Sequence, residues 1–158
     1  MATPIKAGLI ETKKINADIN ASIHNRFDVE VVEAQTGKIK QRAHGENVIC
    51  SQLWTQLFTP ATYFEYIHYG TGSGTPAVAD TSLFAFLGYG RPEVADDVYA
   101  YNRTGGYYSL RRKIQLSETT AVGSTITEVG IGYSTTAATL CTHAMLKDAN
   151  GNQISIAK

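Results

Sequence analysis

The feature that most constrains the fold is an aromatic segment, residues 64–69, that runs directly into a glycine-rich turn. Gly70, Gly72 and Gly74 alternate with small polar residues, and Pro76 follows them. Apolar and aromatic residues before such a turn predict a strand. The glycines allow positive φ angles and a close approach of the backbone to its surroundings, and the proline stiffens the exit. We therefore expect a strand that ends in a sharp reversal of the chain.

This turn looks like a phosphate-binding loop, but it lacks the cation that such a loop needs. A P-loop ends in Gly-Lys-Ser or Gly-Lys-Thr, and no lysine occurs between Val48 and Arg112. We interpret the turn as a folding device instead. Asp80 or Thr81 is expected to cap a short helix over 82–88, with Leu83, Phe84 and Leu87 on its apolar face and Gly88 at its end.

The first half of the chain predicts a β-hairpin followed by a helix. Phe27, Val29 and Val31 alternate with acidic residues, and a Gln-Thr-Gly turn at 35–37 separates them from a basic segment at 38–44, which predicts a hairpin with one solvated face. Asn47 is expected to cap a helix that Thr59-Pro60 ends. The apolar stripe of this helix contains Val48, Ile49, Leu53, Trp54, Leu57 and Phe58, and Trp54 is interpreted as a core anchor.

The second half predicts short strands joined by tight turns. Segments 98–102 and 107–116 flank an Arg-Thr-Gly-Gly turn, further strands are expected at 126–133 and 140–147, and a turn at 148–152 leads back into 153–156. The predicted fold class is mainly β or α+β, a single β-sandwich-like domain with two short helices. The expected organisation is an N-terminal arm or short helix over 1–25 and one β-rich domain over 26–158.

Charge and hydropathy argue against nucleic-acid and membrane partners. Only 18% of the 158 residues are charged and the formal net charge is +0, so no broad field attracts a polyanion. No stretch approaches the roughly 18 apolar residues that span a bilayer. We expect the protein to be made in the cytoplasm and to associate with other protein surfaces.

The cysteines and histidines form no sequence motif for metal binding or catalysis. Cys50 and Cys141 are far apart in the sequence, so two buried free thiols are expected, with a disulfide between them as the alternative. The histidines at 24, 44, 68 and 143 lack the spacing of a zinc helix, and no Gly-x-Ser-x-Gly elbow occurs. We predict no metal, no cofactor and no catalytic residue.

Tyrosines and arginines between residues 89 and 112 are the best candidates for recognition. Tyrosine gives rigid contact area with a hydroxyl at low entropic cost, and both residue types are enriched at subunit interfaces. An interface is favoured, and stacking of host-surface sugars is the alternative. The candidate residues are Tyr89, Arg91, Tyr99, Tyr101, Arg103, Tyr107, Tyr108 and Arg112.

Several segments together resemble a group of small bacteriophage virion proteins. They are Asn47-x-x-Cys50, Ile67-His68-Tyr69-Gly70-Thr71-Gly72 with its proline, Asp80-Thr81-Ser82-Leu83, and the later segments 107–114, 126–130 and 143–148. The resemblance covers roughly residues 45–156 and is one of pattern. It implies a non-enzymatic virion role around the tail or its fibres, and it supplies no catalytic residues.

The expected function follows from this resemblance. The chain is expected to be a structural subunit of the tail or tail-fibre apparatus, located in the virion and assembled in the host cytoplasm. Its expected partners are other virion proteins and further copies of itself. The alternatives are a capsid decoration or head-fibre protein, and a carbohydrate-binding module that recognises a host-surface glycan.

Overall fold

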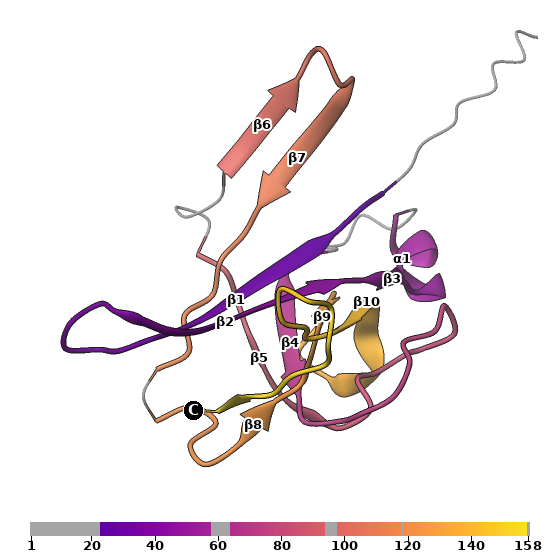
Figure 1. The fold of residues 1–158 in the computed structure, drawn as a ribbon. Helices are drawn as coiled ribbons and strands as arrows, with labels where there is room; N and C mark the ends of the chain where they lie inside the picture. Colours follow the sequence, from indigo (N-terminus) through magenta and orange to yellow (C-terminus); the bar gives the residue numbers. More distant parts are fainter. Residues whose placement is uncertain (1–22, 58–63, 94–97, 118, 158) are drawn as a thin grey trace, which may run out of the picture.

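The computed structural model describes residues 23–57, 64–93, 98–117 and 119–157 (Figure 1). Within these residues the chain is mainly β, which confirms the predicted fold class, but it has a single α-helix, α1 (Ser51–Gln56), and one short 3-10 turn, η2 (Ala137–Thr139). The strands in chain order are β1 (Arg26–Val32), β2 (Ile39–Glu46), β3 (Val48–Ile49), β4 (Tyr66–Gly70), β5 (Phe86–Gly90), β6 (Val98–Asn102), β7 (Tyr107–Arg111), β8 (Thr125–Ile126), β9 (Glu128–Gly132), β10 (Leu140–Met145) and β11 (Ile156–Ala157).

The body is organised around a five-stranded antiparallel sheet with the order β3-β10-β9-β4-β5. Directly paired residues of antiparallel strands point to the same side of the sheet. The pairing of Tyr69 with Val129, and of Val129 with Ala144, therefore defines one apolar face. The pairing of Gly70 with Glu128, and of Gly130 with His143, defines the other face, which carries small and ionisable residues.

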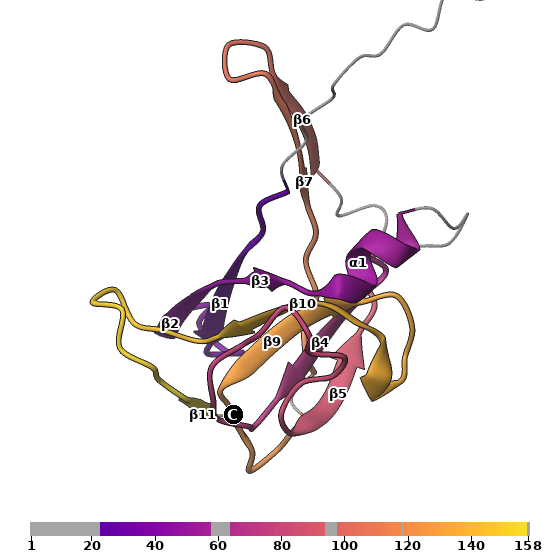
Figure 2. The ribbon, with the colours of Figure 1, turned by 90° about the vertical axis from the view of Figure 1, so that its right-hand side faces the viewer.

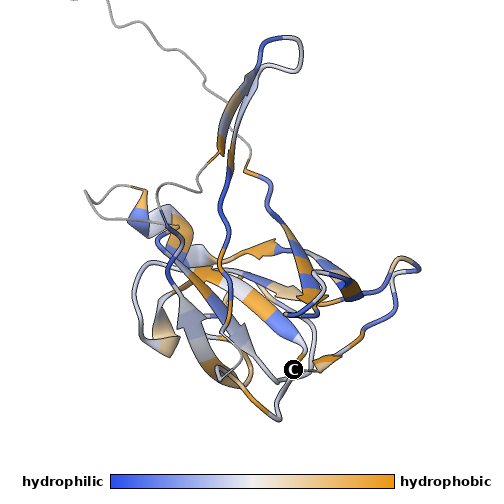
Figure 3. Ribbon diagram, turned by 90° about the vertical axis from the view of Figure 1, so that its left-hand side faces the viewer, coloured by the Kyte–Doolittle hydropathy of each residue, from blue (hydrophilic) through white to orange (hydrophobic). Residues whose placement is uncertain are grey.

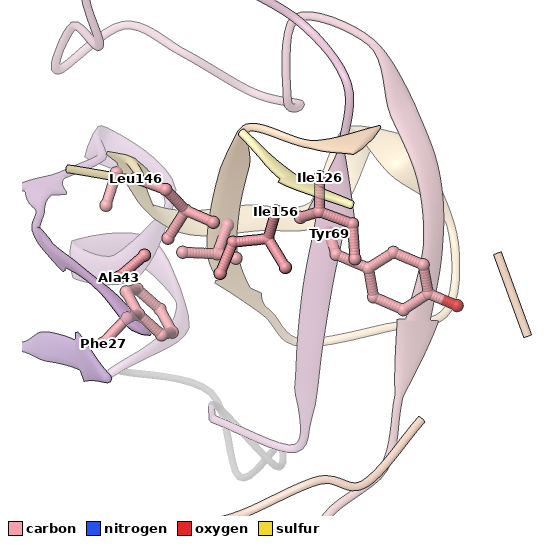
Figure 4. Packing of buried hydrophobic residues seen from close by; sticks show 8 residues of the cluster. Phe27, Ala43, Tyr69, Ile126, Leu146 and Ile156 are labelled. Atoms are coloured by element: carbon pink, nitrogen blue, oxygen red, sulfur yellow. The ribbon is translucent and has the colours of Figure 1, made fainter. Parts of the chain in front are cut away.

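The apolar face packs against the first hairpin of the chain, β1–β2, which was predicted from its alternating pattern. Phe27 and Ala43 of this hairpin meet Leu146, which follows β10, while Tyr69 and the short pair β8–β11 close the other side of the cluster (Figure 4). Figure 3 shows hydrophobic residues concentrated along the strands of the body. Sheet and hairpin together make a sandwich-like core.

The opposite face is covered by residues 71–85, which we call the glycine loop. Leu83 of this loop packs with Cys50 and Leu140 in a second buried cluster. The backbone bond from Thr71 to Ala85 closes the loop, and two others join it to its surroundings, from Ser51 to Val78 and from Leu140 to Thr81. The loop thus connects the start of α1 with the start of β10.

Strands β6 and β7 form a separate two-stranded sheet, which we call the arm (residues 98–111). The arm stands clear of the body in two perpendicular views (Figures 1 and 2). All residues of both strands are exposed. The predicted hairpin is thus confirmed, but Ile114 and Leu116, expected on the same strand, lie beyond it and pack on the main core.

The predicted second helix is wrong. Residues 81–85 form turns and bends, and Leu87 and Gly88 belong to β5. The amides of Phe84 and Ala85 donate to the buried Glu128 carboxylate, so they are not available for a helical ladder. Leu83 is buried as expected, whereas Leu87 is 41% exposed.

The predicted first helix is shorter than expected and begins elsewhere. Val48 and Ile49 form β3, so the residue at the N-cap position is Cys50 and not Asn47. Leu53 is buried, but Trp54 is 45% exposed and is not a core anchor, which corrects that interpretation. Phe58 and Thr59-Pro60 lie outside the described residues, as does most of the expected N-terminal arm. In the part of the chain that the structure describes, no helix has the length and apolar character of a membrane span.

Candidate functional site

Asp80 of the glycine loop meets two ionisable residues of the central sheet, Glu128 of β9 and His143 of β10. The Nδ1 atom of His143 lies 2.7 Å from Asp80 Oδ2, and its Nε2 atom lies 2.9 Å from Glu128 Oε2. The side chains of His143 and Glu128 are fully buried, and that of Asp80 is 18% exposed. We call this group the carboxylate–histidine cluster.

Glu128 binds the glycine loop through backbone amides. Its Oε1 atom accepts hydrogen bonds from the amides of Gly72 and Ala85, both at 2.8 Å. Its Oε2 atom accepts from the amide of Phe84 at 2.9 Å as well as from His143. Converging amides of a glycine-rich loop are a typical site for an anion. Here the protein's own carboxylate is that anion, which explains why the loop looks like a phosphate loop without its lysine.

His143 is doubly protonated in this arrangement. A neutral imidazole donates from one nitrogen only, whereas both nitrogens of His143 face carboxylate oxygens. Burial by itself lowers the pKa of His143, but the hydrogen bonds to Glu128 and Asp80, together with the charges of these carboxylates, raise it by more. The net result is a pKa above the ordinary histidine value. The hydrogen-bond geometry and the direction of the pKa shift therefore both indicate a doubly protonated ring.

Glu128 is ionised for the same reason. Burial raises the pKa of its carboxyl group, but hydrogen bonds from His143 and from the amides of Ala85, Phe84 and Gly72 outweigh burial and lower the pKa below its ordinary value. A carboxylate that accepts several hydrogen bonds is strongly held in its charged form.

The carboxylate–histidine cluster is a structural clamp, because its atoms are bonded to one another and to the backbone of the glycine loop. Both nitrogens of His143 are occupied by carboxylates, so neither is positioned to take a proton from a nucleophile. The oxygens of Glu128 are likewise bonded to the loop. Within the described residues, no group of histidine, cysteine, aspartate and glutamate side chains has the arrangement of a metal site. The clamp fixes loop, β9 and β10 to one another.

The predicted turn residues lie close to this clamp. A Cβ atom on Gly72 would lie 2.6 Å from Glu128 Oε1 and 2.8 Å from the amide nitrogen of Ala85, and one on Gly70 would lie 2.6 Å from the carbonyl oxygen of Ala85. Close approach therefore requires glycine at both positions. Gly74 packs on the Phe84 ring, and Pro76 precedes Ala77, whose amide donates to Asp80 at 2.8 Å. Asp80 caps this turn and not a helix.

The two cysteines lie opposite each other across β3 and β10, and both are buried and free, as expected. The amide of Cys50 donates to the carbonyl of Cys141 at 2.9 Å. Burial raises the pKa of Cys50 to about 12 and that of Cys141 to about 11, so both remain thiols at neutral pH. His68 is also fully buried: its Nε2 atom lies 2.8 Å from the carbonyl oxygen of Ser134, and burial lowers its pKa.

The structure divides the predicted recognition residues between the arm and the β4–β5 edge of the body. The arm carries Tyr99, Tyr101, Tyr107 and Tyr108, and Arg103 lies in the turn at its tip. Tyr101 and Tyr108 are directly opposite and stack, with ring centroids 4.5 Å apart and an angle of 25° between their planes. These four tyrosines are 69%, 55%, 54% and 83% exposed, in sequence order.

The remaining predicted residues, Tyr89, Arg91 and Arg112, contact the segment 64–66 at the start of β4. Arg91 forms an ion pair with Glu65 and lies 6.0 Å from the centre of the Tyr66 ring. Tyr89 meets the same ring edge-on at 5.5 Å. Arg112, the residue that follows the arm, donates to the carbonyl of Phe64. Arg91 and Tyr89 therefore pack within the β4–β5 edge of the body, and Arg112 ties the end of the arm to it.

Glu128 and His143 were not predicted as a pair from the sequence. A signal was present, because each is a single ionisable residue within an otherwise apolar or glycine-rich strand segment, 128–132 and 140–146. Such residues are rarely buried unless they are paired. Asp80 lies 63 positions before His143, so the sequence pattern did not show that these two side chains meet.

Comparison of the chain with protein-family models, with curated proteins and with solved structures finds no match in any of the three.

Proposed function

We propose that this chain is a non-enzymatic structural subunit of a bacteriophage virion, part of the tail or tail-fibre apparatus, that binds neighbouring subunits through its arm. The observation that carries the proposal is the arm itself. A two-stranded hairpin is marginally stable alone in water, yet here it stands away from the body with exposed tyrosines along its length. Such an element is suited to contact with another protein surface.

The ionisable groups of the body support a structural role. Asp80, Glu128 and His143 are bonded to one another and to backbone amides, and the buried thiols of Cys50 and Cys141 are held protonated. The resemblance to small virion proteins described above supplies the class of assembly. The near-neutral charge of the chain also favours association with further copies.

Mass spectrometry of purified virions tests the proposal. The chain should be present in intact particles after nuclease and protease treatment. Copy number separates the tail from the head, since a tail part occurs in on the order of tens of copies or fewer, while a capsid decoration occurs in on the order of hundreds. Absence from particles would refute the virion role.

A carbohydrate-binding module is the second candidate. A groove of about 310 Å³ lined by Tyr99, Tyr101, Tyr108 and Leu110 lies on the arm, and exposed aromatic rings can stack on sugars. Binding on a glycan array that is lost in Tyr101→Ala, with unchanged folding, would favour this function.

A further inference from the structure

We infer that one face of the arm packs against the same face of a second copy of this chain. The inference rests on the proposed function, because it names the partner of the arm in that assembly. It also assigns the contact to a particular set of side chains and excludes another set on the same hairpin.

The register of β6 and β7 separates the arm into two faces. Directly paired residues share a face, and successive pairs alternate between faces. The first face, which we call the tyrosine face, consists of the pairs Tyr99–Leu110 and Tyr101–Tyr108. The second face consists of Val98–Arg111, Ala100–Ser109 and Asn102–Tyr107.

The second face satisfies its polar groups within the arm. The side-chain amide of Asn102 donates to the Tyr107 hydroxyl at 3.1 Å, and the Ser109 hydroxyl donates to the carbonyl of Ala100 at 3.4 Å. Gly105 packs under the Tyr107 ring and its amide donates to Asn102 at 2.8 Å. These bonds stabilise the turn, so Tyr107 has a structural role inside the hairpin.

The tyrosine face is aromatic and apolar. It carries no charged side chain, and the stacked rings of Tyr101 and Tyr108 form its centre. Tyr108 is the most exposed of the large hydrophobic residues in the described part of the chain, at 83%. A charged partner would find no complementary group on this face, whereas an identical uncharged aromatic face is complementary to it. Two-fold contacts use the same patch on both subunits, which this face satisfies.

The area available indicates how strong this contact is. Tyr99, Tyr101 and Tyr108 are 69%, 55% and 83% exposed, and a tyrosine buries about 150–250 Å², so each arm offers on the order of 400 Å² from its rings. Leu110 adds to this area. Two arms face to face therefore bury about 1,000 Å², the lower limit for a specific interface. The contact should be reversible for isolated protein and stronger when several subunits are held together.

Sedimentation analysis over a concentration series tests the inference with two matched variants. Tyr108→Ser removes a ring from the tyrosine face, and Val98→Ser removes an exposed apolar side chain from the other face. Wild-type protein should associate reversibly. Tyr108→Ser should raise the dissociation constant at least about tenfold, as for an aromatic hot spot, while Val98→Ser should change it by less than about twofold. Thermal unfolding followed by circular dichroism establishes that each variant is folded.

The outcomes separate this inference from the proposed function. A wild-type chain that stays monomeric at every concentration, or variants that weaken association equally, would overturn the face assignment. Glycan binding lost only in Tyr108→Ser, by a monomeric protein, would assign the face to sugars and also overturn it. If the chain is present in virions while Tyr108→Ser associates normally, only the inference fails. If the chain is absent from virions, the function fails.

Discussion

The carboxylate of Glu128 should be one of the largest single contributors to the stability of this domain. The substitution Glu128→Gln keeps the size of the side chain and changes one oxygen to an NH₂ group. The four donors that now converge on Glu128 are the amides of Gly72, Phe84 and Ala85 and the Nε2 atom of His143. A glutamine oxygen serves those on one side, while its NH₂ group places donor against donor on the other.

The loss of stability expected for Glu128→Gln follows from the complete burial of the Glu128–His143 pair. Removing one partner of a buried ion pair costs about 3–5 kcal/mol, because the other charge is left without compensation. For a domain of this size, about 1 kcal/mol lowers the melting temperature by about 2–4 °C, so Glu128→Gln should lower it by about 6–20 °C. Urea unfolding gives the free energy directly, and calorimetry gives the melting temperature.

Glu30→Gln is the matched control. Glu30 pairs with Arg42 at 3.0 Å on the exposed first hairpin, where the two side chains are 45% and 71% exposed. An exposed pair of this kind contributes about 0.2–1 kcal/mol. If both substitutions destabilise the domain by the same small amount, the reasoning about the buried cluster is refuted.

Three further predictions concern the same region. His143 has a raised pKa, so its contribution to stability is complete below the ordinary histidine pKa and is lost as pH rises through the folded value; His143→Gln should remove this alkaline loss in pH-dependent urea melts, and an unchanged pH profile would contradict the assignment. Gly72→Ala should destabilise the domain by about 1–3 kcal/mol because its methyl group meets Glu128 and the loop backbone, whereas Gly37→Ala, where the space is open, tests only the cost of a positive φ. Cys50 and Cys141 should react slowly with iodoacetamide in the folded protein and fast in urea, as mass spectrometry will show; rapid alkylation of native protein would contradict their burial.

The elements that were predictable from the sequence are those set by local pattern. Alternation at 26–44 and a glycine turn at 103–106 define hairpins whose partners are adjacent in sequence, and both hairpins are present. The apolar run at 140–146 also predicted a strand, and β10 is present there, inside the five-stranded sheet. These segments needed no information about distant residues.

The failures arise where a distant residue outweighs local preference. Leu83, Phe84 and Leu87 have helical spacing, but the amides at 84 and 85 bind a carboxylate more than 40 positions away in the chain, so the segment turns into a strand. The site shows the same limit. The tyrosines of the arm lie close together in the sequence and could be proposed from it, whereas the clamp of Asp80 and His143 joins residues separated by 63 positions. Hydrophobic periodicity relates only residues that are near one another in sequence, so it does not predict such pairs.

The arm contributes none of its residues to either buried cluster, although Ile114 and Leu116, which follow it in the chain, pack on the main core. Its composition is therefore under little constraint from folding. A related chain can lengthen this hairpin, exchange its aromatic rings or receive a foreign hairpin at residues 98–111, and the scaffold beneath will still form. Under the proposed function, the residues that contact a neighbouring subunit and the residues that form the core lie in separate segments of the chain, so the preference for a partner can change while the core stays the same.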